Sequence, residues 1–363
     1  MNIGTNQITT TQTFAILGST LVAVGSFTFP RALATDVGTP DMWMSVILGG
    51  LITFLSGLFV VKLSQQFPKQ TFFQFNQIIV GKYLGWGLSL GFIIYAILLG
   101  SFEIRAMGEV TKFYLLEGTP LSVLMICMLW VGTYLLAGGI NAMARLFEFI
   151  YPITIFIFLL VVMLGIVNFE IDNVRPVLGN GVMPIIKGLV PTLLTNSGME
   201  FLLVWIAFMK RPKQATKVLR WGVFLTVFIY FVTIIITTGV FSVERLQVET
   251  WPTLSLIQSY EFKGVFIERF ESVFLVVWII QIFATYAVCH YIAALGVADI
   301  FKLKYKKTVY FLLPILYVVA LAPSDLNQLS SLGSVIGYIS ISFSLVIPIF
   351  LLIITKLRGL KSE

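Results

Sequence analysis

The chain has 363 residues, of which 58% are hydrophobic and only 11% are charged, and its mean hydropathy is +0.96. Water-soluble domains carry about 25% charged residues, so this composition excludes a soluble fold. The formal net charge of +7 comes from residues clustered between apolar runs, which makes nucleic-acid binding a poor explanation for it.

Apolar runs follow one another along the chain, separated by short polar connectors. A helix that crosses a bilayer needs about 20 mostly apolar residues. Hydropathy and turn residues predict ten such spans, numbered 1 to 10 in chain order, near residues 9 to 33, 42 to 66, 83 to 107, 119 to 138, 144 to 168, 187 to 209, 217 to 241, 270 to 298, 308 to 323 and 333 to 355. The sequence therefore predicts an all-α integral membrane protein, with residues 1 to 363 forming a single transmembrane domain.

Span 1 is interrupted near its middle. It reads AILGSTLVAVGSFTFPRAL, with Gly25 and Ser26 near mid-depth and Pro30 closing its outer part. A break in a membrane helix frees backbone N–H and C=O groups, so it persists only where protein, water or a ligand satisfies them. Small residues are also common where membrane helices pack closely, which is the alternative explanation.

Span 3 carries aromatic residues on one helical face. Tyr95, Leu98 and Phe102 share that face, which either closes a ligand pocket or packs in the core. Glu103 lies farther along the same span, and we expect its side chain to reach the outer interface.

Span 6 is interrupted like span 1, five spans later. It reads VPTLLTNSGMEFLLVWIAFM, and its polar residues near mid-depth are Thr195, Asn196, Ser197 and Gly198. Broken helices at corresponding positions indicate a five-plus-five inverted repeat with the binding site at the breaks. The repeats would cover about residues 9 to 168 and 187 to 355. Glu200 follows the second break, where its carboxylate could titrate, bind a cation or pair internally.

The ends of broken helices suit a zwitterion. The N-terminal end of a half-helix offers free N–H donors to a carboxylate, and the C-terminal end offers carbonyls to an ammonium group. The predicted donors are the N–H groups of Ser26, Phe27 and Thr28. The predicted acceptors are carbonyls near Val22, Ala23 and Thr195. A neutral amino acid would satisfy both ends.

Span 8 contains a short polar stripe in the segment QIFATYAVCH. Gln281 and Thr285 are four residues apart and so share a helical face. These side chains either line the cavity or form hydrogen bonds with a neighbouring helix.

The distribution of basic residues predicts the orientation in the membrane. If the N-terminus is cytoplasmic, 16 of the 24 lysine and arginine residues lie on the cytoplasmic side, which places both termini there. The clusters at 210 to 220 and 302 to 307 act first as topology determinants and second as contacts for anionic membrane lipid. The connector from 242 to 270 is too polar to span and is expected to hold a short helix on the membrane surface.

The segments GSFTFPRAL and TNSGMEFLLVWIAFMKRP, together with the length and the ten-span layout, carry a family resemblance. The chain resembles the B subunits of nutrient germinant receptors, the spore germination permeases within the amino acid/polyamine/organocation superfamily. The resemblance extends over essentially the whole chain. Relatives often have two glycines spaced by a small polar residue where this chain has Ala23-Val24-Gly25.

This resemblance implies a location in the spore inner membrane and work beside an A subunit and a lipoprotein C subunit. It implies that the chain recognises a germinant, often an amino acid. The family's first break corresponds here to Val24, Gly25, Ser26 and Phe27, and its second to residues 195 to 198. Some proton-coupled relatives carry a lysine on span 5, and this chain has none there.

The leading hypothesis is a sensing subunit that binds a small neutral amino acid and signals to its partners. The alternative is a secondary amino-acid transporter linked to protons or sodium. No spacing in the sequence matches a catalytic nucleophile with its base, a phosphate-binding loop or a metal-ligand cluster, so neither an enzyme nor a cofactor is expected.

Overall fold

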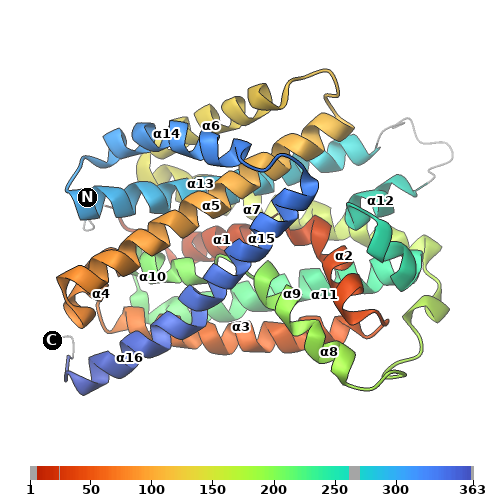
Figure 1. Ribbon diagram of the computed structural model, residues 1–363, viewed down its shortest axis with the longest axis horizontal. Helices are drawn as coiled ribbons and strands as arrows, with labels where there is room; N and C mark the ends of the chain where they lie inside the picture. The colour runs from red at the N-terminus through yellow and green to blue at the C-terminus, as the bar shows by residue number, and fades with distance from the viewer. Residues whose placement is uncertain (1–5, 24, 261–269, 361–363) are drawn as a thin grey trace.

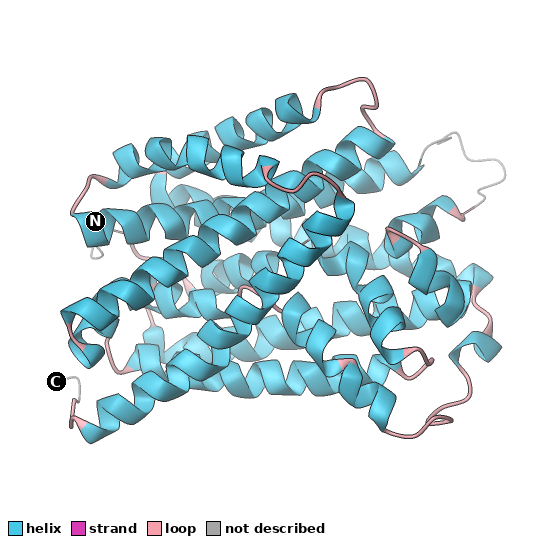
Figure 2. Ribbon diagram, in the orientation of Figure 1, coloured by secondary structure: helices cyan, strands magenta, loops and turns pink. Residues whose placement is uncertain are grey.

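The computed structural model describes residues 6 to 23, 25 to 260 and 270 to 360. Helices form nearly all of the described chain (Figure 2), and its β structure is limited to one isolated parallel bridge between Ile8 and Met209. The predicted all-α fold is confirmed.

In the first half of the chain, two capping boxes mark helix starts: Thr9 with Gln12, and Thr71 with Gln74. Each pairs a side chain with an otherwise unpaired N–H group of the first turn. The helices of this half are α1 (Thr10–Leu21), α2 (Gly25–Val37), α3 (Met42–Gln65), α4 (Phe72–Val80), α5 (Lys82–Tyr114), α6 (Leu121–Ala137) and α7 (Gly139–Met163).

In the second half, span 6 consists of short pieces. These are α8 (Met183–Lys187), α9 (Leu189–Thr195), the 3-10 turn η4 (Met199–Phe201), α10 (Leu202–Trp205) and η5 (Ile206–Phe208). The helices that follow are α11 (Ala215–Val248), α12 (Pro252–Gln258), α13 (Phe270–Phe301), α14 (Tyr305–Leu321), α15 (Leu326–Ile341) and α16 (Ile347–Leu357), with a π-helical turn, η7 (Ser342–Val346), between the last two.

The number of membrane crossings was predicted as ten. In the described ranges, six helices are long and apolar enough to cross a membrane, or eight crossings result if each of two bent pairs counts as one. Helices α6 and α14 have 17 residues each, fewer than the about 20 that a crossing needs. The count of ten therefore stays a prediction.

Helix α1 occupies the centre of the bundle, where it packs against α7, α11 and α13 (Figure 1). Helices α15 and α16 run diagonally across the front of the bundle, where α15 packs against α5 and α9, and α16 packs against α3 and α4 (Figure 1). Because α1 is surrounded by long helices, any break at its end is enclosed by protein.

The connector after span 7 differs from the prediction. Helix α11 continues beyond residue 241 to Val248 across a kink at Ser242, whose φ is 61°. The short helix α12 forms as expected, but it is buried rather than lying on the membrane surface, with Leu254 and Leu256 at 0% exposure. Its apolar side chains pack against α2 and α11, which removes them from contact with water or lipid.

Candidate functional site

The two helix breaks lie against each other in the centre of the bundle. The axes of α1 and α2 differ by 48°, and the two parts of span 6 differ by 44°. A methyl group added at Gly25 would lie 2.6 Å from Thr195 Cγ2, and one at Gly198 would lie 2.4 Å from Thr20 Cγ2. The structure thus brings the two predicted breaks into contact, while Val24 lies outside the described residues.

The carbonyl groups at the end of α1 are satisfied by side chains from other helices. Gln281 Nε2 and Thr285 Oγ1 of α13 both donate to the Ser19 carbonyl, at 2.8 and 2.9 Å. The Tyr230 hydroxyl of α11 donates to the Leu21 carbonyl at 2.7 Å. Of the two roles left open for Gln281 and Thr285, interhelical hydrogen bonding is therefore present.

The start of α2 provides the donor end of this break. The hydroxyl of Ser26 donates to the Ala23 carbonyl at 2.8 Å, and the Ser26 carbonyl accepts a 2.8 Å bond from Thr253 of α12. Phe27 is fully buried, and its ring lies 4.0 Å from that of Trp278 between centroids. Helix α12 therefore covers the span 1 break.

A small cavity lies beside this break. Its volume is about 10 Å³, which is about the space that one water molecule requires. Spans 1, 5 and 8 supply its walls, through Val22, Ser26, Thr154, Ile155, Phe158, Phe274, Val277, Trp278 and Gln281. We call it the span 1 cavity. Gln281 lines it while bonding to α1, so the two predicted roles of this residue are compatible.

The span 6 break is filled by its own side chains. Asn196 Nδ2 donates to Thr53 Oγ1 at 3.1 Å, while the hydroxyl groups of Thr195 and Ser197 bond to carbonyls of their own helix. Gly198 has a φ of 111°, a conformation that favours glycine. None of these residues belongs to the described lining of the span 1 cavity.

Glu200 is fully buried beside the second break. Its Oε1 accepts hydrogen bonds from the Tyr95 hydroxyl and from the Gly198 N–H group, the latter at 2.8 Å. Its Oε2 accepts from the Ser340 hydroxyl of α15 at 3.1 Å. Of the roles left open for Glu200, internal pairing is therefore present, and it joins spans 3, 6 and 10.

The span 3 residues do not line the span 1 cavity. Tyr95 is buried against Glu200, and Leu98 is half-buried on the same helix. The prediction for Glu103 is wrong, since its side chain is 2% exposed and lies inside the bundle rather than at the outer interface. Helix α5 turns this position toward neighbouring helices, whereas Arg105 pairs with Glu109 at 2.8 Å.

Several residues of the site had no role in the prediction from sequence. They are the polar or aromatic side chains of Thr154, Tyr230, Thr253, Trp278 and Ser340, none of which stands out from its neighbours in the sequence. A polar residue alone in a span is a weak signal because it often bonds only to its own helix. Their partners lie far away in sequence, so only the fold reveals them.

The architecture defines the class of the protein. Long apolar helices around two broken spans make it an integral membrane protein of a transporter fold. The solved structure of MhsT in complex with L-phenylalanine is similar, with a TM-score of 0.68 and 11% identity over 95% of this chain and 97% of that chain. MHP1, a nucleobase-cation-symport-1 family transporter with bromovinylhydantoin bound, has a TM-score of 0.64 and 14% identity over 90% of this chain and 74% of that chain.

The family follows from the sequence comparisons. Residues 7–329 match the family model described as spore germination protein. Spore germination protein YndE of Bacillus subtilis (strain 168) is 42% identical over 98% of both chains. Spore germination protein A2 of the same organism is 37% identical over 97% of this chain and 96% of its own. The chain belongs to the spore germination protein family.

Proposed function

We propose that this chain is the germinant-sensing subunit of a spore nutrient receptor and binds a small neutral amino acid at the span 1 break. The observation that carries the proposal is the span 1 cavity, which adjoins the donor end of α2 at Ser26 and the amide of Gln281. The proposed chemistry is binding alone.

The two ends of the break suit the two charges of the ligand. The first N–H groups of α2 have no partner within their own helix, and the dipole there favours a carboxylate. The amide oxygen of Gln281 accepts a 3.1 Å bond from Thr154, and the carbonyl groups ending α1 accept from other helices. Each of these oxygens has a second lone pair, with which it would accept a hydrogen bond from an ammonium group. A pocket for a small molecule has a volume of about 300–1,000 Å³, so the ligand would enter only as the Phe27 and Trp278 rings separate and α12 moves away from Ser26.

Ligand binding would shift the balance between two arrangements of the helices. A ligand changes such a balance only through a difference in its affinity for the two states. Rocking of one repeat against the other would produce that difference at the break. We propose that the change passes to an A subunit and a lipoprotein C subunit in the spore inner membrane, with both termini of this chain cytoplasmic.

A pair of serine substitutions tests the site. Ser26→Ala removes a cavity hydroxyl, and Ser56→Ala removes a buried hydroxyl on α3 that makes the same local bond to a carbonyl, at 2.9 Å instead of 2.8 Å. Germination of spores carrying each variant is followed against a panel of single nutrients. We expect Ser26→Ala to raise the nutrient concentration needed for half response, with Ser56→Ala unchanged at equal protein level. An equal response from both variants would refute the site.

A secondary amino-acid transporter linked to protons or sodium is the second candidate. The fold similarity to MhsT, solved in complex with L-phenylalanine, favours it. In that role Glu200 would be the proton or ion site. Uptake of radiolabelled amino acids into vesicles containing only this chain tests the idea, because a sensor subunit alone would not accumulate substrate.

A further inference from the structure

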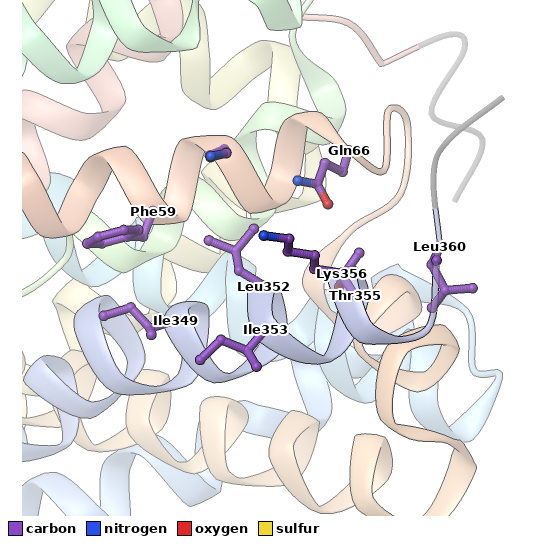
Figure 3. A pocket seen from close by; sticks show the side chains of 10 residues that line it. Phe59, Gln66, Ile349, Leu352, Ile353, Thr355, Lys356 and Leu360 are labelled. Atoms are coloured by element: carbon purple, nitrogen blue, oxygen red, sulfur yellow. The ribbon is translucent and has the colours of Figure 1, made fainter.

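A groove runs along the outer side of the bundle between α3 and α16 (Figure 3). Its volume is about 590 Å³, within the range of about 300–1,000 Å³ that small-molecule pockets occupy. The groove is separate from the span 1 cavity, with which it shares no lining residue. It is lined by Phe59, Lys62, Gln66, Ile349, Leu352, Ile353, Thr355, Lys356, Gly359 and Leu360.

The part of the groove farther from the C-terminal ends of α3 and α16 is apolar. Phe59 of α3 and Ile353 of α16 are 39% and 53% exposed, and Ile349 and Leu352 complete this wall. Lys356 lies seven positions after Ile349, which at 1.5 Å per residue is roughly 10 Å along the helix axis. This length of apolar surface lies on membrane-crossing helices and so faces hydrocarbon.

The end of the groove next to the C-termini of α3 and α16 is basic. Lys62 lies in the last turn of α3 and Lys356 in the last turn of α16, and both are exposed. In Figure 3, Lys356 extends from α16 across the groove toward α3, where Gln66 lies beside it. Among the described residues neither lysine forms an ion pair, whereas the neighbouring Arg358 donates to the carbonyl of Ile79.

We propose that this groove binds an anionic phospholipid. Its acyl chain would lie along Phe59 and Ile353, and its phosphate would lie between the ammonium groups of Lys62 and Lys356. An amphiphile matches the order of the lining, apolar at membrane depth and cationic where the helices end. Two exposed lysines, with no acidic partner among residues 6 to 23, 25 to 260 and 270 to 360, supply charge that a lipid phosphate complements.

The two helices that form the groove also lead toward the span 6 break. Thr53 of α3 accepts the hydrogen bond from Asn196. Helix α16 follows α15, whose Ser340 donates a hydrogen bond to Glu200. A lipid that joins α3 to α16 would therefore hold in place the two helices that anchor this break. The proposal does not depend on which amino acid, if any, binds at span 1.

Lipid binding to the purified full-length protein tests the proposal. Phosphatidylglycerol and phosphatidylcholine with the same acyl chains are added in detergent, and native mass spectrometry counts the lipids bound. We expect the wild-type protein to prefer phosphatidylglycerol. Lys62→Gln with Lys356→Gln should lower its affinity for that lipid roughly thirtyfold. The matched control, Lys112→Gln with Lys187→Gln, removes the same charge at exposed positions outside the groove and should leave the preference unchanged.

A second variant tests whether lipid binding depends on the shape of the groove as well as on its surface charge. Ile349→Trp keeps both lysines but narrows the apolar wall, so it should also weaken phosphatidylglycerol binding. Size-exclusion profiles and thermal unfolding midpoints establish that each variant is folded. The proposal is overturned if wild-type protein shows no preference between the lipids, if Ile349→Trp binds as wild type does, or if the control variant loses as much affinity as the groove variant. If a groove variant lost a co-purifying partner subunit but kept its bound lipid, the proposal would also be overturned, and the groove would be a binding site for a helix of that subunit.

Discussion

The two broken spans carry the same signal in the sequence and differ in what surrounds them. At the span 1 break, side chains from α11, α12 and α13 reach in to satisfy the backbone, and a small cavity remains. At the span 6 break, three hydrogen bonds stay within the span itself, and three more join it to spans 2, 3 and 10. One break thus adjoins a small cavity, and the other is held by a buried carboxylate of its own span.

An acidic residue accounts for much of this difference. The first turn after the span 6 break contains Glu200, whose carboxylate accepts the Gly198 N–H group. The first turn of α2 contains no acidic residue in its described range, Gly25 to Thr28. Because helix N-termini favour an anion, Glu200 occupies the position that a ligand carboxylate would take. The first turn of α2 has no such side chain, and its Ser26 N–H group donates to the Ala23 carbonyl at 3.1 Å. This asymmetry favours span 1 as the carboxylate site.

The largest effect is expected from removing the Glu200 carboxylate. Glu200→Leu leaves the donors of Tyr95, Ser340 and Gly198 without an acceptor, at about 1–3 kcal/mol for each buried donor. We expect a large drop in the thermal unfolding midpoint of the purified protein. The control is Glu117→Leu, at an exposed loop position. Equal midpoints for the two variants would contradict the idea that Glu200 fills the break.

Glu200→Gln extends the same comparison from stability to function. It keeps the size of the side chain and part of its hydrogen bonding but removes the ability to titrate. If Glu200 is a proton site, the pH dependence of the germination response should shift in this variant. A purely structural role predicts an unshifted pH profile.

Backbone strain provides the next largest effect. Gly198→Ala places a side chain at a φ of 111° and within 2.4 Å of Thr20 Cγ2, so we expect a loss of about 1–3 kcal/mol in the free energy of unfolding. Adding Thr20→Ser removes the clashing methyl group and should recover only part of the loss. Gly118→Ala is the control, because no atom lies within 4 Å of that position. An unchanged free energy of unfolding in Gly198→Ala would show that the backbone at the second break can adjust to a side chain.

A smaller, non-additive effect is expected at the span 1 break. Gln281 and Thr285 donate to one carbonyl, so either donor alone still satisfies Ser19. We expect Gln281→Leu and Thr285→Val each to cost about 0.5–1.5 kcal/mol, and the double variant to cost more than their sum. Equilibrium unfolding in mixed detergent micelles measures this double-mutant cycle. Additive losses would mean that the two donors act independently.

The smallest effect on stability is expected where α12 covers the break. Thr253→Val removes the bond to the Ser26 carbonyl and should cost about 0.5–1.5 kcal/mol. Thr237→Val removes a buried bond within α11 and serves as the control. We expect only Thr253→Val to change the nutrient concentration needed for half response. The same germination curve from both variants would argue against α12 as the cover of the site.

The sequence located both breaks because local chemistry creates them. Gly25 and Ser26 on one side, and Asn196, Ser197 and Gly198 on the other, are poor helix formers in apolar surroundings, and the structure bends at both places. The pairing of Tyr95 with Glu200 and of Ser340 with Glu200 could not be read in the same way. These partners are 105 and 140 residues apart, and a helical face in a membrane gives no sign of whether lipid or another helix covers it.

Composition and the order of apolar runs were sufficient by themselves to determine a helical membrane protein with two interrupted spans, while the family resemblance came from the segments GSFTFPRAL and TNSGMEFLLVWIAFMKRP. Only the tertiary structure decided which break keeps a cavity, that Glu103 lies inside the bundle and that α12 is buried over Ser26. The physical reason is the range of the interactions. Hydrophobicity and helix propensity act within one segment, whereas the hydrogen bonds that close or open a break join helices that are distant in the chain.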